Sequence, residues 1–131
     1  MSKTIFITGS STGLGRATAL LFAQKGWKVI ATLRNPDKEE ELGKVPGITL
    51  LAMDVTKPDQ IEAAVQQALA LGPVDVVFNN AGYGLAGPFE GATDEQIVQE
   101  VNTNLLGVLR TTKAFIPSFR ERGAGTFIAT T

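Results

Sequence analysis

A glycine-rich turn near the N-terminus decides the fold: residues 8–15 are Thr8-Gly9-Ser10-Ser11-Thr12-Gly13-Leu14-Gly15. The turn follows a short apolar run and precedes apolar residues with helical spacing, which is the context that a nucleotide-binding glycine loop requires. Gly9 allows a sharp turn out of the strand, Gly13 lets a pyrophosphate approach the backbone, and Gly15 lets the helix pack closely. The pattern therefore predicts that free N–H groups at the start of the helix bind phosphates.

Three hydroxyl side chains of this turn, Ser10, Ser11 and Thr12, are expected to reach the phosphates as well. The alternative is a tight glycine-rich turn that binds no ligand. A P-loop is excluded, because Gly15 is followed by Arg16-Ala17 and not by Lys and then Ser or Thr.

Outward from this turn, strand and helix patterns alternate along the whole chain. Apolar runs predict five strands, at residues 4–8, 27–33, 48–53, 74–79 and 126–131. Helices are expected at residues 13–25, 36–42, 56–71 and 94–117. Strands that alternate with helices predict a parallel sheet covered on both faces. The expected fold is a single Rossmann-like domain over residues 1–131, a three-layer, doubly wound α/β sheet with strand order 3-2-1-4-5.

Local signals set the expected helix bounds. The first helix has apolar residues at Leu14, Ala17, Leu21 and Phe22, and Gly26 follows its end. Thr56 is the expected cap of the helix at 56–71. Thr93 and Gln96 form a capping box before the long helix, and Pro117 marks where that helix bends or ends.

Composition excludes several classes of function. Lys plus Arg number 12 and Asp plus Glu number 13, a net charge of −1, so nothing suggests a nucleic-acid or membrane partner. Cysteine and histidine do not occur, which excludes disulfides, thiolate nucleophiles and a Ser-His-Asp triad, and we expect no metal site. No secretory signal or membrane-spanning run is visible, so a cytoplasmic location is expected.

Three further motifs follow the glycine turn. They are Asp54-Val55 after the third expected strand, Asn79-Asn80-Ala81-Gly82 at the end of the fourth, and Asn104-Leu105-Leu106-Gly107 in the long helix. With the spacing Thr-Gly-x-x-x-Gly-x-Gly at residues 8–15, they resemble the motifs of classical short-chain dehydrogenases/reductases, in the same order and over the whole chain. The resemblance implies an oxidoreductase that transfers hydride between a nicotinamide dinucleotide and a carbonyl or alcohol.

The resemblance also implies a role for each motif. Asp54 would accept a hydrogen bond from the adenine amino group, and the Val55 N–H would serve a ring nitrogen. Asn80-Ala81-Gly82 would line the adenosine ribose, whereas Asn79 would tie its strand to neighbouring elements as a buried amide. Asn104 would help to hold a water on a proton-relay path, the alternative being an ordinary polar helix position.

The end of the second strand decides which dinucleotide is preferred. Members of the family that prefer NAD carry an acidic residue there. In this sequence Leu33 stands at that position and Arg34 follows it. A carboxylate would repel a 2′-phosphate, whereas a guanidinium binds one with charge-assisted hydrogen bonds. We therefore expect NADP(H) in preference to NAD(H), the alternative being that Arg34 is a solvated loop residue.

The family's catalytic serine, tyrosine and lysine are not found here. In the family the tyrosine and lysine stand four residues apart on one helix. Tyr83 is the only tyrosine of this chain, and Gly87 stands four positions after it. We therefore expect the N-terminal, cofactor-binding half of such an enzyme, inactive by itself, with a small carbonyl or alcohol substrate only in a longer parent.

Two alternatives stay open: a non-catalytic dinucleotide-binding regulatory module, and a structural or engineered minimal Rossmann domain. In each case the strand at 126–131 would expose an apolar edge, and the long helix at 94–117 an apolar stripe. We expect the chain to form homo-oligomers through one or both of these surfaces.

Overall fold

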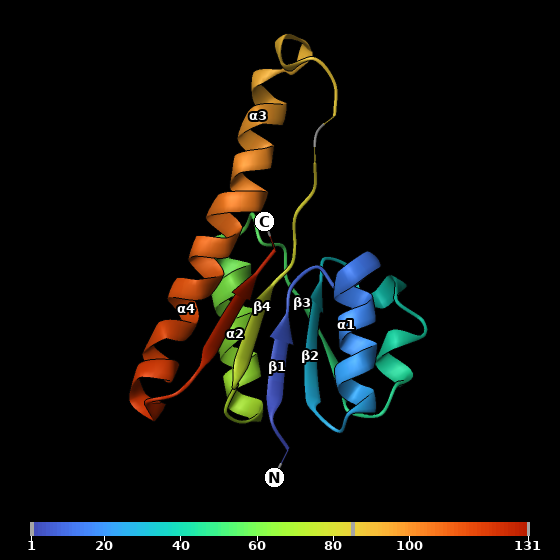
Figure 1. Ribbon diagram of the computed structural model, residues 1–131, viewed down its shortest axis with the longest axis vertical. Coiled ribbons are helices and arrows are strands. Elements are labelled where there is room, and N and C mark those ends of the chain that lie inside the picture. The colour runs from blue at the N-terminus through green and yellow to red at the C-terminus, as the bar shows by residue number, and fades with distance from the viewer. Residues whose placement is uncertain (1, 85, 131) are drawn as a thin grey trace.

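The computed structural model describes residues 2–84 and 86–130. Its centre is a sheet of five parallel strands in the order β3-β2-β1-β4-β5 (Figure 1). In chain order the strands are β1 (Thr4–Ile7), β2 (Lys28–Leu33), β3 (Ile48–Ala52), β4 (Val76–Asn79) and β5 (Thr126–Ala129). The predicted fold and strand order are confirmed. Residue 131, expected in the last strand, lies outside the described residues.

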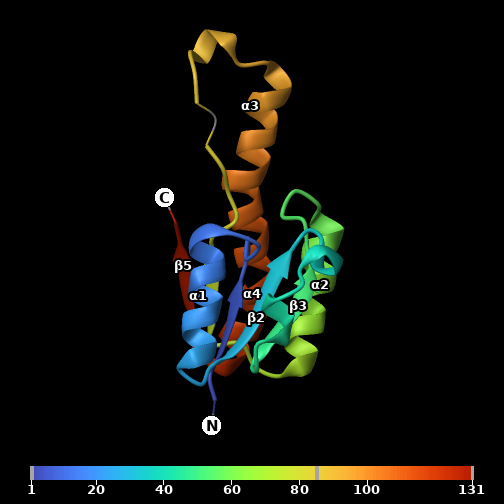
Figure 2. The same ribbon diagram turned by 90° about the vertical axis from the view of Figure 1, so that its right-hand side faces the viewer.

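Helices cover both faces of the sheet and make it the middle of three layers. On one face, α1 (Gly13–Gln24) packs over β1 and β2. On the other face, α2 (Pro58–Leu71) and α4 (Gly107–Arg122) pack around Phe6 and Phe115, whose ring centroids lie 4.8 Å apart. Figure 2 shows α1 and α2 on opposite sides of the strands. The strands are continuous apolar runs because both faces are covered.

Not every apolar residue of α1 packs inward. Leu14 and Leu21 are 58% and 48% exposed. The buried residues of the helix are Gly15 and Ala19. Small side chains let the helix backbone come close to the sheet, so residue size and not hydropathy decides which face is buried.

The far end of α1 packs against the start of β2. Phe22 meets Trp27 edge to face at a centroid distance of 4.9 Å, and Nζ of Lys3 lies 6.0 Å from the Trp27 ring. Gly26 follows the helix with a φ of +87° and donates its N–H to the Ala23 carbonyl, as its expected capping position requires.

The segment expected as a helix at 36–42 contains two short 3₁₀ turns instead. These are η1 (Pro36–Lys38) and η2 (Leu42–Lys44). Glu39 between them has an extended backbone, and its carboxylate accepts the N–H groups of Glu41 and Leu42. A side chain that binds backbone N–H groups in this way competes with a continuous helix.

The expected cap at Thr56 is wrong, whereas the capping box at Thr93 is confirmed. α2 begins at Pro58, and the Thr56 hydroxyl donates to Asp54 at 2.7 Å instead of capping the helix. Proline fits the first helical position because no intrahelical partner awaits an N–H there. Thr93 Oγ1 accepts the Gln96 N–H, and the Gln96 side chain accepts the Thr93 N–H in return.

The long helix consists of three consecutive segments: α3 (Asp94–Val101), the π-helical turn η4 (Asn102–Leu106) and α4. It does not end at Pro117 but continues to Arg122, although a proline removes one N–H donor and crowds the preceding turn. Its first half projects beyond the carboxyl ends of the strands (Figures 1 and 2). This projection places one turn of the helix beside the functional site.

Candidate functional site

A cavity of about 470 Å³ opens where β1, β2, β3 and β4 end. Its lining includes most of the residues that the sequence singles out: Gly9, Ser11, Thr12, Gly13, Leu14, Arg34, Asp54, Val55, Asn80, Ala81 and Gly82. These residues belong to four separate turns, each of which follows a strand. In doubly wound sheets such a crevice at the carboxyl ends of the strands is where ligands bind.

Glycines allow the turns after β1 and β4 to touch. Gly9 has a φ of +67°, and a Cβ added to it would lie 2.7 Å from the Cα of Ala81. A Cβ added to Gly15 would overlap the Gly9 carbonyl and the Asn80 side-chain amide. Any larger residue at Gly15 would therefore push α1 away from the cavity.

Hydroxyl groups at the end of β1 connect the turns. Thr8 is buried, and its Oγ1 accepts the N–H groups of Asn80 at 3.0 Å and Ala81 at 2.9 Å. Ser10 is also buried and does not line the cavity, because its N–H donates to the Thr32 carbonyl and its hydroxyl to the Ile7 carbonyl. Ser10 thus shapes the turn from beneath, and the structure does not bring its hydroxyl to the expected phosphate position.

The two asparagines after β4 differ in their surroundings. Asn80 lines the cavity, and its Nδ2 donates to the Gly9 carbonyl at 3.1 Å. Asn79 is buried and donates to the hydroxyl of Thr112 on α4 at 3.1 Å. Asn79 therefore ties β4 to a neighbouring helix, as the sequence predicts.

Asp54 is held in place by the turn after β3. Its Oδ1 accepts the backbone N–H and the hydroxyl of Thr56, while its own N–H donates to Gln60. Partial burial favours the neutral carboxyl, but the Thr56 hydrogen bonds and the charge of Arg34 outweigh it, so the pKa of Asp54 lies below its ordinary value. Among the described residues, only Oδ1 of this carboxylate is engaged in hydrogen bonds. The neighbouring Val55 is buried and packs against Gly107.

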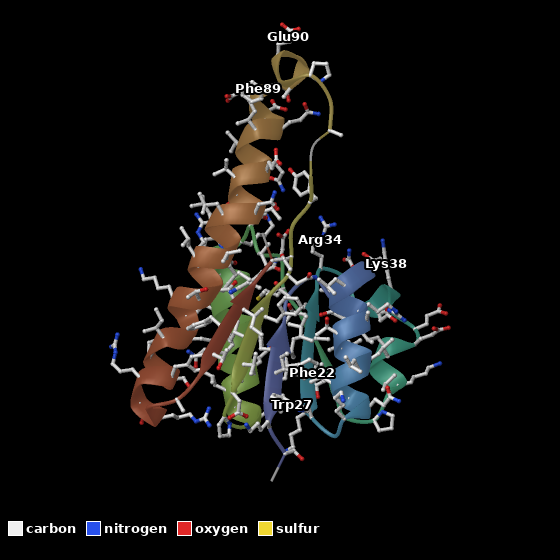
Figure 3. All side chains as sticks on the ribbon, in the orientation of Figure 1. Phe22, Trp27, Arg34, Lys38, Phe89 and Glu90 are labelled. Atoms are coloured by element: carbon white, nitrogen blue, oxygen red, sulfur yellow. The ribbon has the colours of Figure 1, made fainter. Side chains whose placement is uncertain are left out.

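Arg34 directly follows β2, and Leu33 before it is buried. The Arg34 side chain extends beyond the carboxyl ends of the strands, as does that of Lys38 (Figure 3). Within residues 2–84 and 86–130, Arg34 forms no ion pair. Its guanidinium is therefore free to meet an anion at the cavity rim.

Asn104 lies in the π-helical turn and does not line the cavity. Its side-chain oxygen accepts the Tyr83 N–H at 2.9 Å, and its Nδ2 donates to the Tyr83 carbonyl at 2.6 Å. Both ends of the amide are thus engaged with one peptide segment. Asn104 thus positions the loop after Gly82, and it lines a neighbouring cavity between that loop and the projecting helix.

Sequence reasoning missed part of the cavity wall. Tyr83 lines it from the loop, and Gln99 and Thr103 line it from the projecting helix. Gln99 and Thr103 stand four residues apart and so share one helix face, a signal that points to no cavity until the helix is placed beside the turns.

The described residues contain no cluster of three or more potential metal ligands. None of the helices in this part of the chain is both long and apolar enough to span a bilayer.

Known proteins resemble this chain in sequence and in fold. A family model described as short chain dehydrogenase matches residues 3–131. A 3-ketodihydrosphingosine reductase of Bacteroides thetaiotaomicron is 39% identical over 125 residues, which are 95% of this chain and 45% of that protein.

Two crystal structures share the fold at a similar level of identity. An alcohol dehydrogenase of the archaeon Thermococcus sibiricus, complexed with 5-hydroxy-NADP, matches with a TM-score of 0.90 and 34% identity over all of this chain and 58% of its own. A 3-ketoacyl-(acyl-carrier-protein) reductase of Brucella melitensis, complexed with NADH, matches with a TM-score of 0.87 and 34% identity over 92% of this chain and 51% of its own. The chain thus spans about half the length of these proteins. The match across residues 3–131 places it in the short-chain dehydrogenase family.

Proposed function

We propose that this chain is the NADP(H)-binding portion of an oxidoreductase that transfers hydride between the nicotinamide and a carbonyl or alcohol. One observation carries the proposal: four turns at the carboxyl ends of adjacent strands bring together at one cavity a glycine loop, the Asp54 carboxylate and the Arg34 guanidinium, which forms no ion pair with the described residues. The alcohol dehydrogenase of Thermococcus sibiricus, a related chain, was crystallised with an NADP derivative.

The pyrophosphate would lie at the start of α1. The cap residue Thr12 makes no side-chain hydrogen bond to the helix, so its hydroxyl and the free N–H groups of the first turn are available to an anion. Ser11 lines the cavity beside it. The adenine amino group would donate to Asp54, and the small residues Ala81 and Gly82 would leave room for the ribose.

The 2′-phosphate would meet Arg34. Leu33 contributes no carboxylate to repel that phosphate, and Arg34 is free of an internal partner among the described residues. The Brucella melitensis reductase was crystallised with NADH, so the dinucleotides found in the related structures differ. The preference of this chain must therefore be measured with both dinucleotides side by side.

These 131 residues would bind the dinucleotide without turning over a substrate by themselves. Tyr83 is their only tyrosine and has no lysine four positions later. The side-chain amide of Asn104 is occupied by the Tyr83 backbone. Oxidation of NADPH by the purified chain with a panel of ketones, above a heat-denatured control, would contradict this part of the proposal.

We further propose that copies of the chain associate through the long helix or the edge strand β5. An exposed apolar stripe runs along α3, η4 and α4, with Val98, Val101, Leu105, Leu109 and Ile116. Acidic residues gather toward the N-terminal half of this helix and basic residues toward the C-terminal half. A second copy packed antiparallel would pair opposite charges while covering the stripe.

The decisive experiment measures the thermal stability of the purified chain against NADPH and NADH. A ligand that binds only the folded state adds about 2.7 kcal/mol at a hundredfold excess over Kd. We expect a clear rise in Tm with NADPH and a small one with NADH. Arg34→Ala should weaken NADPH binding about tenfold to a hundredfold, because it removes charge-assisted hydrogen bonds worth roughly 1.5–3 kcal/mol, and should leave NADH almost unaffected.

The matched control is Arg120→Ala, which removes the same side chain from an exposed position at the end of α4. It should change neither affinity. Equal losses for both dinucleotides in Arg34→Ala would contradict the preference. No Tm rise with either dinucleotide would contradict binding altogether and favour a purely structural domain.

A further inference from the structure

An ion pair lies beside the cavity without lining it. Arg16 stands one residue after Gly15, on the first turn of α1, and its Nη1 lies 2.8 Å from Oε2 of Glu39. The Glu39 side chain is only 11% exposed. A second carboxylate, that of Glu41, lies 3.7 Å from the same guanidinium but is 88% exposed. The pair with Glu39 is therefore the closer and better shielded of the two.

The other oxygen of Glu39 organises the backbone around it. Oε1 accepts the N–H of Leu42 at 2.8 Å and that of Glu41 at 3.2 Å. The hydrogen bonds from Leu42 and Arg16 keep the pKa of Glu39 below its ordinary value, so the carboxylate is ionised at neutral pH. Leu42 itself is fully buried in the core on the α1 side. One carboxylate thus links the first turn of α1 to the 3₁₀ turn η2.

The segment between the end of β2 and Glu39 carries two cations, Arg34 and Lys38, near the cavity rim. It runs from Arg34 through η1, which ends at Lys38, to Glu39. Among the described residues, the backbone hydrogen bonds of residues 35–41 reach only to their own neighbours in sequence. The Arg16–Glu39 pair is therefore the polar connection that holds this segment against the glycine turn.

We propose that Glu39 is a positioning residue for cofactor preference: by binding Arg16 it fixes the 34–39 segment so that Arg34 faces the 2′ position of the dinucleotide. This inference rests on the proposed NADP(H) function. We call the ion pair of Arg16 and Glu39 the clasp, and the inference assigns Arg16 to this pair and not to a phosphate of the ligand. Neither residue of the pair lines the cavity, so we expect their effect to be confined to where Arg34 is held.

The test compares NADPH and NADH affinities in variants of the whole chain. Glu39→Gln keeps one acceptor oxygen for the Leu42 N–H but loses the charge that holds Arg16. We expect the preference for NADPH over NADH to fall about tenfold, because displacing a charged group by roughly an ångström weakens its interaction steeply. Glu40→Gln, one position further on at an exposed residue, removes the same charge from the same region and should leave the preference unchanged.

Arg16→Gln and the double variant separate a clasp from a phosphate contact. If Arg16 acts only through Glu39, Arg16→Gln should match Glu39→Gln, and the double variant should lose no more than either. Hydrogen exchange of residues 35–41 gives a readout without cofactor and should be faster in Glu39→Gln than in Glu40→Gln. An additional loss of NADPH affinity in the double variant would overturn the inference.

Other outcomes fall clearly on one side. If the wild-type chain prefers NADPH and Glu39→Gln shows the same preference, the inference is overturned and the proposed function still stands. A higher NADPH affinity in Glu39→Gln would mean that a released Arg16 binds the phosphate, and it also overturns the clasp. Wild-type chain that binds neither dinucleotide overturns the proposed function itself.

Discussion

Single atoms decide how closely the turns of the cavity approach one another. The Gly15 α-carbon packs on the Gly9 carbonyl and the Asn80 amide, and Thr8 Oγ1 joins the turns after β1 and β4. The roles of these glycines can be predicted from their spacing, because each spacing corresponds to a distinct steric requirement of the turn. It does not predict the burial of Ser10. That depends on the Ser10 N–H bonding to Thr32, a contact between residues distant in sequence.

At this scale we predict that Gly15→Ala removes binding and lowers stability together. The added methyl group would overlap backbone atoms that cannot move without displacing α1, which costs about 2 kcal/mol by analogy with overpacked cores. Denaturant unfolding and NADPH titration measure the two effects. Gly91→Ala is the control, since a Cβ there meets nothing within 4 Å. A Gly15→Ala chain with unchanged stability would contradict the close packing.

At the end of the sheet opposite the cavity, the carboxylate of Asp75 joins β1, β4 and α4. Asp75, just before β4, accepts the Thr4 N–H at the start of β1, and the Arg122 guanidinium at the end of α4 donates to it at 3.0 Å. Partial burial opposes ionisation, but these hydrogen bonds outweigh it, so the pKa of Asp75 lies below its ordinary value of 3.8. Asp75 thus stabilises the fold in its charged form.

The expected consequence is a loss of stability in acid. Because the folded-state pKa is depressed, the contribution of Asp75 is complete above the unfolded-state value near 4 and disappears as pH falls through the folded-state pKa. Asp75→Asn should cost about 1 kcal/mol at pH 7 and flatten the decline below pH 4. Unfolding free energies between pH 2 and 7 measure this. Glu62→Gln, at an exposed position of α2, should leave the acid decline as it is in the wild type.

Element bounds show what local sequence can and cannot predict. The capping box at Thr93 is correct because both of its hydrogen bonds lie within one helical turn. Thr56 fails as a cap because the helix begins one residue later than expected, with Pro58 at its first position and Lys57 at the cap. The helix expected at 36–42 fails because the Glu39 carboxylate binds the N–H groups of Glu41 and Leu42, and Arg16, 23 positions away from Glu39, holds the same carboxylate. Competition from tertiary partners is not visible in a window of sequence.

The whole molecule buries its sheet unevenly. Every residue of β1 is buried, whereas all four residues of β5 are exposed. The parallel sheet with helices on both faces followed from the alternation of elements. The face that α1 turns inward did not, because small and large apolar residues both fit helical spacing. The exposed apolar surface therefore falls on β5, on the outer side of α1 and along the projecting helix.

For the whole molecule we predict association that depends on concentration. Leu109→Glu puts a charge into the middle of the exposed stripe of the long helix and should shift the chain toward monomer. Light scattering after size-exclusion chromatography, over a range of concentrations, measures the mass. Leu71→Glu, a comparably exposed leucine on α2, is the control. Wild-type chain that stays monomeric at high concentration would contradict self-association through either surface.

The packing of Trp27 against Phe22 gives the molecule an internal optical probe. Trp27 is the only tryptophan of the chain, and Figure 3 shows it at the end of the sheet opposite Arg34. Its emission will therefore follow the docking of the far end of α1. Unfolding of this end of the molecule can thus be recorded in the chain without dinucleotide and without an added label.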